Sequence, residues 1–486
     1  PIFDWVPVLV FAFVVWVSPH AAMPQGVHIE GGIIQDLDPA TGDVIDLVQA
    51  TSLEELGATV AAAKRAQPAW AAVAPEERAG LLKAACAGLL ERTEELARTI
   101  SLEMGKVLME AQGEAFSAAD KDELVDMALR ANEDVLVEGG RAVVVRRPHG
   151  IVAVCSPWNF PADELLMLAI PALVAGNAVI VKPSEVAPLS GAIVVRTLQK
   201  ALPEGLLGLV QGDGSVGAPL VEHPDVDMVA MTGSSGSGKK IMEACSKSLK
   251  PLVLELGGKD PMVVFADADL EKAAEDAVAN SLFNCGQVCC SIERIYVQEA
   301  VRADFEAKVA DKAAQWKAGN PLQDGSRVGP LATRAQREIV SRHVEEAIAA
   351  GARVLYKGEA PPSPEGSSFY PVTVLSNLRQ EMTIQQEETF GPVICLAGFE
   401  GTEDEAVSLA NDTPYGLTAC VYTADAERAQ RVARRIRAGQ VGINAYPMLC
   451  APVACPWAGH RSSGLGYHSG PDGWRQFSLP QSIIQE

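Results

Sequence analysis

The sequence predicts an α/β protein built on parallel sheets, because expected strands and helices alternate along most of the chain. Strands are expected at residues 151–155, 178–182, 206–211 and 227–231, with helices at 164–174, 189–202 and 216–223 between them. This alternation favours right-handed crossovers within a parallel sheet. A second region of the same kind starts at residues 252–265, and further helices are expected at 270–283 and 301–318.

The segment before this alternation is predicted to be mostly helical. Ser52 and Glu55 form a capping-box pattern that opens an alanine-rich helix ending near Trp70. Two further helices are expected to follow it, and the β-branched residues 141–147 predict a strand. Proline and glycine within residues 361–366 indicate a surface loop.

The composition bounds the class of protein. With 486 residues the chain is long enough for about two to four domains. Its 62 acidic and 40 basic residues give a net charge of −22, which argues against nucleic acid as a partner, because phosphate binding needs clustered Lys and Arg. Ten cysteines are too few for a disulfide scaffold. We therefore expect an ordered protein of an intracellular, reducing compartment, either the cytoplasm or an organelle.

Residues 6–17 stand apart as a run of 12 apolar side chains. The run is shorter than the roughly 20 residues that span a bilayer, and small residues follow it, as they do in signal peptides. Two interpretations stay open: a targeting or anchor segment that contacts a membrane through residues 6–17, or an element packed on the body of the protein. Residues 1–28 are therefore treated as an N-terminal extension.

Two glycine-rich sites follow expected strands. Gly212, Gly214 and Gly217 have G-x-G-x-x-G spacing, which is weak alone because no acidic residue is clearly placed about 20 residues further on. The run 233–240 nearly matches the phosphate loop of NTPases, but Lys240 replaces the hydroxyl that would hold magnesium. An NTPase is thus the weaker interpretation. A helix amino end that favours an anion such as a pyrophosphate is retained.

Three thiols cluster at Cys285, Cys289 and Cys290, beside glycine and polar residues. Zinc would require paired C-x-x-C spacings or nearby histidines, and none of the seven histidines lies within 50 residues of the cluster. No metal site is therefore expected, and a Cys–His protease is disfavoured for want of a partner motif. Core packing could explain one buried cysteine but explains three adjacent ones less well. We therefore favour a nucleophilic cysteine over a purely structural role.

Several short motifs run in one order from about residue 37 to the C-terminus. They are PWNFP at 157–161, GN at 176–177, KPSE at 182–185, TGS at 232–234, LELGGK at 254–259, GQVC at 286–289, EETFGP at 387–392, PYGL at 414–417 after the Asn at 411, and GIN at 442–444. Together they resemble the NAD(P)-dependent aldehyde dehydrogenase superfamily. The resemblance implies a Rossmann-like cofactor domain at 29–130 and 149–256, an α/β catalytic domain at 257–455, and a small β oligomerisation segment at 131–148 and 470–486.

The resemblance assigns catalysis to Cys289, Glu255 and Asn159. Cys289 matches the nucleophile that attacks the aldehyde, and the Asn159 amide with the Cys289 backbone N–H would hold the oxyanion. Hydride transfer to the nicotinamide would leave a thioester, and Glu255 matches the base that activates the hydrolytic water to give a carboxylic acid. The alternatives are a buried Glu255–Lys259 salt bridge, transfer of the acyl group to coenzyme A, and a non-catalytic protein that keeps the fold.

The residues that match the family's cofactor contacts lie in several of these motifs. They are Trp158, Lys182, Ser184, Glu185, Gly212, Gly233, Ser234, Gly257, Glu388 and Phe390. By this match Lys182 and Glu185 would meet the adenine ribose, and Glu388 the nicotinamide ribose. Because a carboxylate at Glu185 repels a 2′-phosphate, we expect NAD, with NADP as the alternative that Lys182 would tolerate.

The expected substrate pocket is where the sequence departs most from the family pattern. Its candidate residues are Phe160, Asp163, Glu164, Met167, Phe283, Val288, Cys290, Leu449 and Trp457. Asp163 and Glu164 stand where the family is apolar. At a tunnel mouth they would favour a cationic aldehyde, and the equal alternative is that they are solvated or face a helix amino end. Arg461 and the pair Tyr467 and His468 also depart, where the family has Lys and Arg-Glu.

The resemblance further implies a homodimer or homotetramer, joined through residues 134–148 and 476–484. The expected small-molecule partner is an aldehyde. The cluster of Cys285, Cys289 and Cys290 is close enough in sequence for the thiols to oxidise among themselves, which would make the enzyme redox-sensitive.

Overall fold

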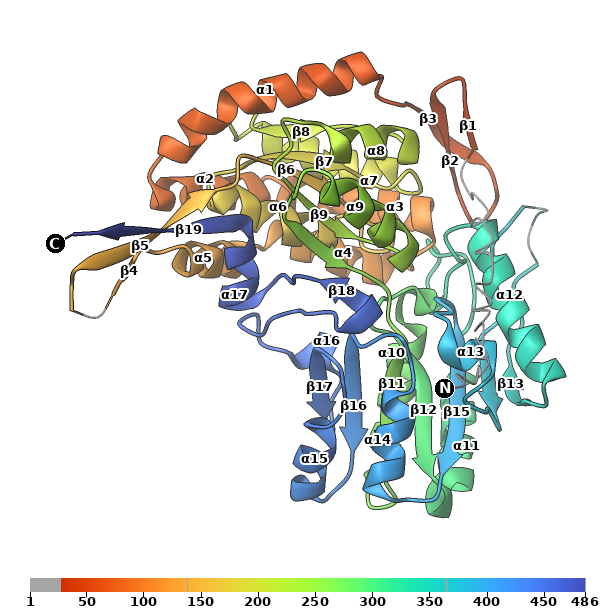
Figure 1. The fold of residues 1–486 in the computed structure, drawn as a ribbon. Helices are drawn as coiled ribbons and strands as arrows, with labels where there is room; N and C mark the ends of the chain where they lie inside the picture. Colours follow the sequence, from red (N-terminus) through yellow and green to blue (C-terminus); the bar gives the residue numbers. More distant parts are fainter. Residues whose placement is uncertain (1–27, 138, 363, 365, 486) are drawn as a thin grey trace, which may run out of the picture.

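The computed structural model describes residues 28–137, 139–362, 364 and 366–485, which form an α/β protein with four sheets (Figure 1). Apart from its last residue, the predicted extension at 1–28, including the apolar run at 6–17, lies outside the described residues. Within the described ranges, no helix is both long and apolar enough to cross a membrane.

The first large sheet has the strand order β18-β10-β9-β6-β7-β8. Five strands run parallel, and they agree with the sequence prediction to within a few residues: β6 (Ile151–Cys155), β7 (Ala178–Lys182), β8 (Leu207–Leu209), β9 (Met228–Thr232) and β10 (Leu252–Glu255). Their near-continuous burial fits a sheet covered on both faces. The antiparallel edge strand β18 (Gly464–Leu465) was not predicted.

The helices of this half of the chain pack along the first large sheet, with α1 stretched across the top of Figure 1. The Ser52–Glu55 capping box is confirmed at the start of α1. The elements are β1 (His28–Glu30), β2 (Ile33–Leu37), β3 (Val44–Gln49), α1 (Leu53–Ala72), α2 (Pro75–Ala87), η1 (Leu90–Arg92), α3 (Thr93–Met104), α4 (Leu108–Ala119), α5 (Asp122–Ala131), α6 (Asp163–Val174), α7 (Pro188–Gln199), α8 (Gly214–Glu222) and α9 (Ser235–Ser246).

The second large sheet has the order β13-β14-β15-β12-β11-β16-β17, and only its edge strand β13 is antiparallel. Its strands are β11 (Asp260–Val264), β12 (Ile292–Gln298), β13 (Arg353–Lys357), β14 (Thr373–Ser376), β15 (Val393–Phe399), β16 (Thr418–Tyr422) and β17 (Gln440–Ile443). The helices are α10 (Leu270–Leu282), η2 (Phe283–Gly286), α11 (Glu299–Ala313), α12 (Arg334–Ala349), α13 (Thr383–Gln386), α14 (Glu403–Asn411), α15 (Ala426–Ala433), α16 (Pro447–Cys450), η3 (Arg461–Ser463), α17 (Gly470–Trp474) and η4 (Arg475–Phe477). Each large sheet lies in its own apolar core.

A β ribbon projects from the body, with the C-terminus near its tip (Figure 1). It consists of β4 (Val135–Leu136), β5 (Ala142–Pro148) and β19 (Ser478–Ile484), paired antiparallel in the order β19-β5-β4. Leu136 and Ile484 on it are each 77% exposed. Exposed apolar side chains on an edge strand suit an interface, but the predicted oligomer and the predicted division into domains remain predictions.

Gly105 provides a test of how the two halves fit together. It ends α3 in a left-handed conformation with φ of 81°, and a Cβ there would lie 2.5 Å from the Pro330 carbonyl oxygen. Gly105→Ala should therefore lower the free energy of unfolding by on the order of 2 kcal/mol, measured as a fall in the thermal midpoint.

Gly113→Ala is the matched control. It lies on the exposed side of α4, where a Cβ meets open space, so it should instead raise the free energy of unfolding by about 0.5–1 kcal/mol. Shifts in the same direction would contradict this close approach.

Candidate functional site

The carboxyl ends of the parallel strands in the first large sheet gather most of the predicted site residues at one edge. Trp158 and Asn159 follow β6, and Lys182 ends β7. Gly233 follows β9, and Glu255 ends β10. Open parallel sheets bind ligands at this edge, where loops diverge and helix amino ends point outward. The first sheet thus presents these side chains to the loop that carries the three thiols.

The thiol loop runs from α10 to β12 and turns sharply. Cys285 and Gly286 have left-handed φ angles of 58° and 71°. A Cβ on Gly286 would lie 2.1 Å from the Gly391 carbonyl oxygen, so only glycine fits there. Cys285 and Cys290 are buried, whereas Cys289 is partly exposed. Of the three thiols, Cys289 is the one that a reactant can reach.

Asn159 connects the first sheet to the thiol loop by hydrogen bonds in both directions. Its side-chain Nδ2 donates to the Gln287 carbonyl oxygen at 3.0 Å, and Asn284 Nδ2 donates to the Asn159 carbonyl oxygen at 3.0 Å. An amide nitrogen carries two N–H groups, and among the described residues only Gln287 accepts from this one. Asn159 is therefore anchored to the thiol loop at Gln287, two residues before Cys289, and its second N–H has no acceptor among the described residues.

A buried ion pair supports the loop that carries Asn159. The side chains of Lys106 and Glu114 are 0% and 2% exposed and form a salt bridge. Lys106 Nζ also donates to the Asn159 carbonyl oxygen at 2.9 Å and lies 3.8 Å from the centre of the Phe160 ring. Glu114 Oε1 accepts from the Ala162 N–H at 2.9 Å. Buried charges need such additional bonds, and here the bonds fix the site loop. Sequence reasoning missed both residues, because neither stands in a recognisable pattern.

Glu255 is a buried carboxyl, 2% exposed, at the end of β10. Its Oε1 accepts a hydrogen bond from Trp457 Nε1 at 2.8 Å. Burial raises the pKa of Glu255 well above its ordinary value, the Trp457 bond lowers it, and the charge of Glu164 raises it further. The alternative salt bridge to Lys259 is wrong, because Lys259 pairs with buried Glu293. Among the described residues Glu255 has no cationic partner, which leaves it free to exchange a proton.

The surroundings of Cys289 hold its thiol protonated. The hydrogen bond with Cys290 raises the pKa of Cys289 most, followed by burial and by the charges of Glu255 and Glu164. The thiolate, not the thiol, attacks carbonyl carbon. Ionisation of Cys289 is therefore easiest while the two carboxyls are neutral.

The structure corrects the expectation of two free acids at the start of α6, whereas both acids do lie at the amino end of that helix, in its first turn. Asp163 is paired with Lys121 and accepts from Ser117 Oγ at 2.8 Å. Burial opposes ionisation of Asp163, but Lys121 outweighs it and lowers the pKa. Glu164 Oε2 accepts from Thr232 Oγ1 at 3.2 Å, and burial, then repulsion from Asp163, raises the pKa of Glu164 to about 7. Neither side chain caps the helix. The two acids therefore do not act as two free negative charges. Asp163 is neutralised by Lys121, and Glu164 is only partly ionised near neutral pH.

The residues predicted for the adenosine half of the cofactor lie in loops after β7, β8 and β9. Lys182 Nζ lies 3.3 Å from the Glu185 carboxylate, and Ser184 follows Lys182 in the same loop. Gly212 follows β8 with φ of 148°. Ser234 caps α9 by accepting a backbone N–H of the helix at 3.1 Å. The amino end of this 12-residue helix therefore faces the same edge of the sheet.

The residues predicted for the nicotinamide half join the two large sheets. Glu388 Oε1 accepts from the Gly258 N–H at 3.0 Å, and a Cβ on Gly257 would lie 2.3 Å from Glu388 Oε2. Burial raises the pKa of Glu388 to about 8. Trp158 and Phe390 meet edge to face with ring centres 5.4 Å apart. Because Gly257 has no side chain, the Glu388 carboxyl can pack against the backbone just after β10.

The predicted substrate pocket is partly assembled from aromatic rings. Phe160 and Phe283 stack across the two halves of the chain, with ring centres 6.3 Å apart. Trp457 stacks on His468, with ring centres 6.5 Å apart. The side chain of Leu449 lies outside the described residues. Three further candidates pack in or against the apolar cores: Met167, Val288 and Cys290.

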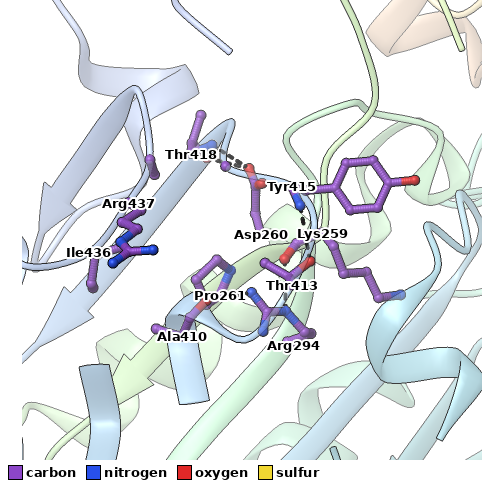
Figure 2. A pocket seen from close by; sticks show the side chains of 12 residues that line it. Lys259, Asp260, Pro261, Arg294, Ala410, Thr413, Tyr415, Thr418, Ile436 and Arg437 are labelled. Carbon is purple, nitrogen blue, oxygen red and sulfur yellow. Dashed lines mark hydrogen bonds between the residues drawn. The ribbon is translucent and has the colours of Figure 1, made fainter. Parts of the chain in front are cut away.

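A separate hollow lies in the second large sheet beside β11, β12 and β16 (Figure 2). Asp260 Oδ2 accepts from the Thr418 N–H at 3.0 Å and from its Oγ1 at 2.6 Å. Arg294 Nε donates to the Lys259 carbonyl oxygen at 2.8 Å. The described residues that line this hollow include none of those predicted for catalysis. Its polar bonds hold neighbouring strands together.

Glu164→Gln tests what it costs to bury this carboxyl. Because burial raises the pKa of Glu164 from 4.5 to about 7, folding disfavours its ionised form, and the wild type loses stability as the pH rises through that interval. The glutamine variant lacks this loss. We expect equal thermal midpoints near pH 4.5 and, near pH 8.5, a variant more stable by on the order of 1–3 kcal/mol.

Glu243→Gln is the matched control for this measurement. Glu243 is exposed on α9, so its substitution should leave the pH dependence of the midpoint unchanged. If the midpoints of Glu164→Gln and wild type ran parallel across this pH range, the buried, proton-binding state of Glu164 would be contradicted.

Comparison with known proteins agrees with this geometry. Residues 28–483 match the sequence profile of the Aldehyde dehydrogenase family. The betaine aldehyde dehydrogenase of Sinorhizobium fredii is 39% identical over 452 residues, covering 91% of this chain and 92% of that protein. Lactaldehyde dehydrogenase from Escherichia coli superposes with a TM-score of 0.89 at 35% identity, covering 94% and 97% of the two chains. A variant of aldehyde dehydrogenase C from Pseudomonas syringae, complexed with NAD+ and octanal, superposes with a TM-score of 0.88 at 34% identity, covering 96% and 97%. The chain therefore belongs to the aldehyde dehydrogenase family of enzymes.

Proposed function

We propose that this protein oxidises an aldehyde to the carboxylic acid with NAD, through a thioester on Cys289. The observation that carries the proposal is the junction of three groups. The partly exposed Cys289 thiol, the Asn159 amide bonded two residues away at Gln287, and the buried Glu255 carboxyl come from different segments, and the charge of Glu255 acts on Cys289. Membership of the aldehyde dehydrogenase family supports the reaction class.

The first half-reaction forms a bond between Cys289 Sγ and the aldehyde carbon. Cys289 loses its thiol proton to solvent, which is easier while Glu255 is neutral. The carbonyl oxygen becomes an alkoxide, and the second N–H of Asn159 with the Cys289 backbone N–H stabilises it; one such donor is typically worth ~2.7–4 kcal/mol. NAD, when bound, supplies the acceptor for the hydride that the thiohemiacetal carbon loses. A thioester on Cys289 remains.

The second half-reaction hydrolyses this thioester. Glu255 takes a proton from water, the water oxygen bonds to the acyl carbon, and the bond from carbon to Cys289 Sγ breaks to release the acid. A carboxyl whose pKa is raised by burial suits both halves, since its neutral form favours the thiolate and its ionised form is a stronger base. The presence of this base favours water over coenzyme A as the acyl acceptor.

The carboxyl edge of the first sheet fits a dinucleotide. The amino end of α9, capped by Ser234, offers N–H groups to a pyrophosphate. We propose that Lys182 and Glu185 contact the adenine ribose and that Glu388 contacts the nicotinamide ribose; the Lys182–Glu185 pair and the Glu388–Gly258 hydrogen bond fix these side chains at that edge. The NAD+ in the Pseudomonas syringae complex supports a nicotinamide cofactor. Because Glu185 would repel a 2′-phosphate, we propose NAD as the preferred cofactor over NADP.

The substrate is proposed as a small aldehyde. The names of the relatives point to different compounds, among them betaine aldehyde and lactaldehyde, and octanal is bound in one neighbour. The aromatic residues Phe160, Phe283 and Trp457 suit an apolar chain or, through cation–π attraction, an onium group. With Asp163 neutralised by Lys121, charge alone gives a cationic aldehyde little advantage.

We also propose that the β ribbon joins subunits into a homodimer or homotetramer. Strand β19 lies at the edge of its sheet, so its outer backbone groups have no neighbouring strand among the described residues. Pairing with a second copy of the chain would satisfy those groups and cover Ile484.

The reaction is tested by following NADH at 340 nm with NAD and a panel of alkyl, hydroxylated and trimethylammonium aldehydes. Cys289→Ala should lower the rate at least about a thousandfold, because the nucleophile is lost. Glu255→Gln should still release about one NADH per site in a burst and then turn over about a hundredfold more slowly, because hydrolysis lacks its base.

Cys285→Ala is the matched control, since this thiol is buried and donates to the Gly329 carbonyl oxygen away from the reaction centre. It should keep wild-type turnover. The proposal fails if no aldehyde gives NADH with wild type, and the assignment of the nucleophile fails if Cys289→Ala remains active.

A further inference from the structure

Trp457 contacts His468 in two ways, through backbone hydrogen bonds and through ring stacking. The Trp457 N–H donates to the His468 carbonyl oxygen at 2.8 Å, and the His468 N–H donates back to Trp457 at 3.3 Å. The two rings stack nearly parallel, at an angle of 19°. We call this arrangement the Trp457–His468 clamp. It gives the indole one orientation relative to the loop that ends in β18.

His468 is suited to a mechanical role in this clamp because it carries no charge near neutral pH. Burial lowers the pKa of His468 to about 4. One ring nitrogen, Nδ1, lies 2.8 Å from Ser469 Oγ, and the buried Nε2 has no partner among the described residues. A neutral ring stacks on the indole without adding a charge beside the reaction centre.

The clamp aims the indole N–H at Glu255. Trp457 Nε1 lies 2.8 Å from Glu255 Oε1, and this is the only hydrogen bond to the Glu255 side chain among the described residues. Glu255 closes β10, so its backbone is held by the parallel neighbour β9. With the backbone fixed at one end and Oε1 anchored at the other, Oε2 is the oxygen left to meet a water molecule.

We propose that the Trp457–His468 clamp positions Glu255 as the hydrolytic base, by anchoring Oε1 so that Oε2 takes the proton from water. The inference rests on the proposed function and adds a positioning residue to it. In the step concerned, a water O–H bond breaks and its proton goes to Glu255 Oε2. The water oxygen bonds to the acyl carbon, the bond from that carbon to Cys289 Sγ breaks, and the Cys289 thiolate and the carboxylic acid are released. The clamp itself exchanges no proton.

The electrostatic surroundings explain why this one hydrogen bond matters. The titratable groups that face Glu255 among the described residues include Glu164 from α6, Asp260 from β11, and the Cys289 and Cys290 thiols of the thiol loop; Glu164, Asp260 and Cys290 oppose its ionisation, as burial does. The indole N–H is the one contact that favours the carboxylate. Its loss would therefore leave a base that is both less well oriented and less ionised at neutral pH.

Trp457→Phe tests the inference, because it keeps an aromatic ring against His468 and removes the indole N–H, although it also removes part of the ring area that stacks there. In stopped-flow measurements the NADH burst should keep a rate constant within about twofold of wild type, while kcat falls about tenfold. The apparent pKa of kcat should rise by about one unit, the shift that corresponds to one hydrogen bond to the carboxylate. Raising the pH should therefore restore turnover, which a merely structural defect would not allow.

Two further variants make the result specific. If Trp457 acts through Glu255, the double variant Trp457→Phe with Glu255→Gln should turn over no more slowly than Glu255→Gln alone. Trp70→Phe is the matched control, because it removes the same indole N–H elsewhere: Trp70 is buried, and its Nε1 donates at 2.9 Å to the Leu173 carbonyl oxygen, outside the site. It should leave the pH profile unchanged.

The outcomes separate this inference from the proposed function. A wild-type enzyme that makes no NADH with any aldehyde overturns the proposed function. If wild type is active, three results would overturn the inference alone. They are a Trp457→Phe variant with no burst and an unchanged pH profile, a Trp457→Phe defect that lies in KM, and a double variant slower than Glu255→Gln. A change in KM alone is what we expect if Trp457 only lines the substrate pocket and does not position Glu255.

Discussion

The hydrogen bonds between Asn159 and the thiol loop are the contacts on which the site depends. They bring the carboxyl edge of one large sheet against a loop that belongs to the other, with Gln287 and Asn284 bonded to Asn159 on either side. The buried pair of Lys106 and Glu114 fixes the same loop from behind. Without this junction Cys289 and the Asn159 side chain would belong to separate halves of the chain, with no hydrogen bonds to fix their relative position.

A second constraint is the full or partial burial of carboxyls that have no salt-bridge partner among the described residues. Glu255, Glu164 and Glu388 all lie near the junction, and burial raises the pKa of each. Other acids nearby are compensated, as Asp163 is by Lys121 and Glu293 is by Lys259. The acidic residues of this region are thus of two kinds. Some form salt bridges that stabilise the fold, and others have a raised pKa and retain a proton closer to neutral pH. Proton exchange needs the second kind.

Local patterns allowed much of the fold and the main site residues to be predicted. Apolar strands alternating with helices predict a parallel sheet, and short motifs that resemble those of the aldehyde dehydrogenase superfamily mark Asn159, Glu255 and Cys289. The sequence could not show long-range pairing. Lys121, which lies between α4 and α5, neutralises Asp163, and this pairing overturned the expectation of two free acids.

The same limit explains the residues that were missed. Lys106 and Glu114 act only through contacts made after folding, and β18 is two residues long. Trp457 was expected only as a pocket residue, because its bond to Glu255 spans 202 positions of sequence.

The central claim is that the acyl group is carried by Cys289 at this junction. Mass spectrometry of Glu255→Gln, quenched with acid shortly after mixing with NAD and an aldehyde that wild type oxidises, tests it most directly. The account predicts a peptide whose mass is raised by the acyl group, with fragmentation placing that group on Cys289. An unmodified peptide at the time of the NADH burst, or an acyl group on Cys290 or Cys285, would contradict it.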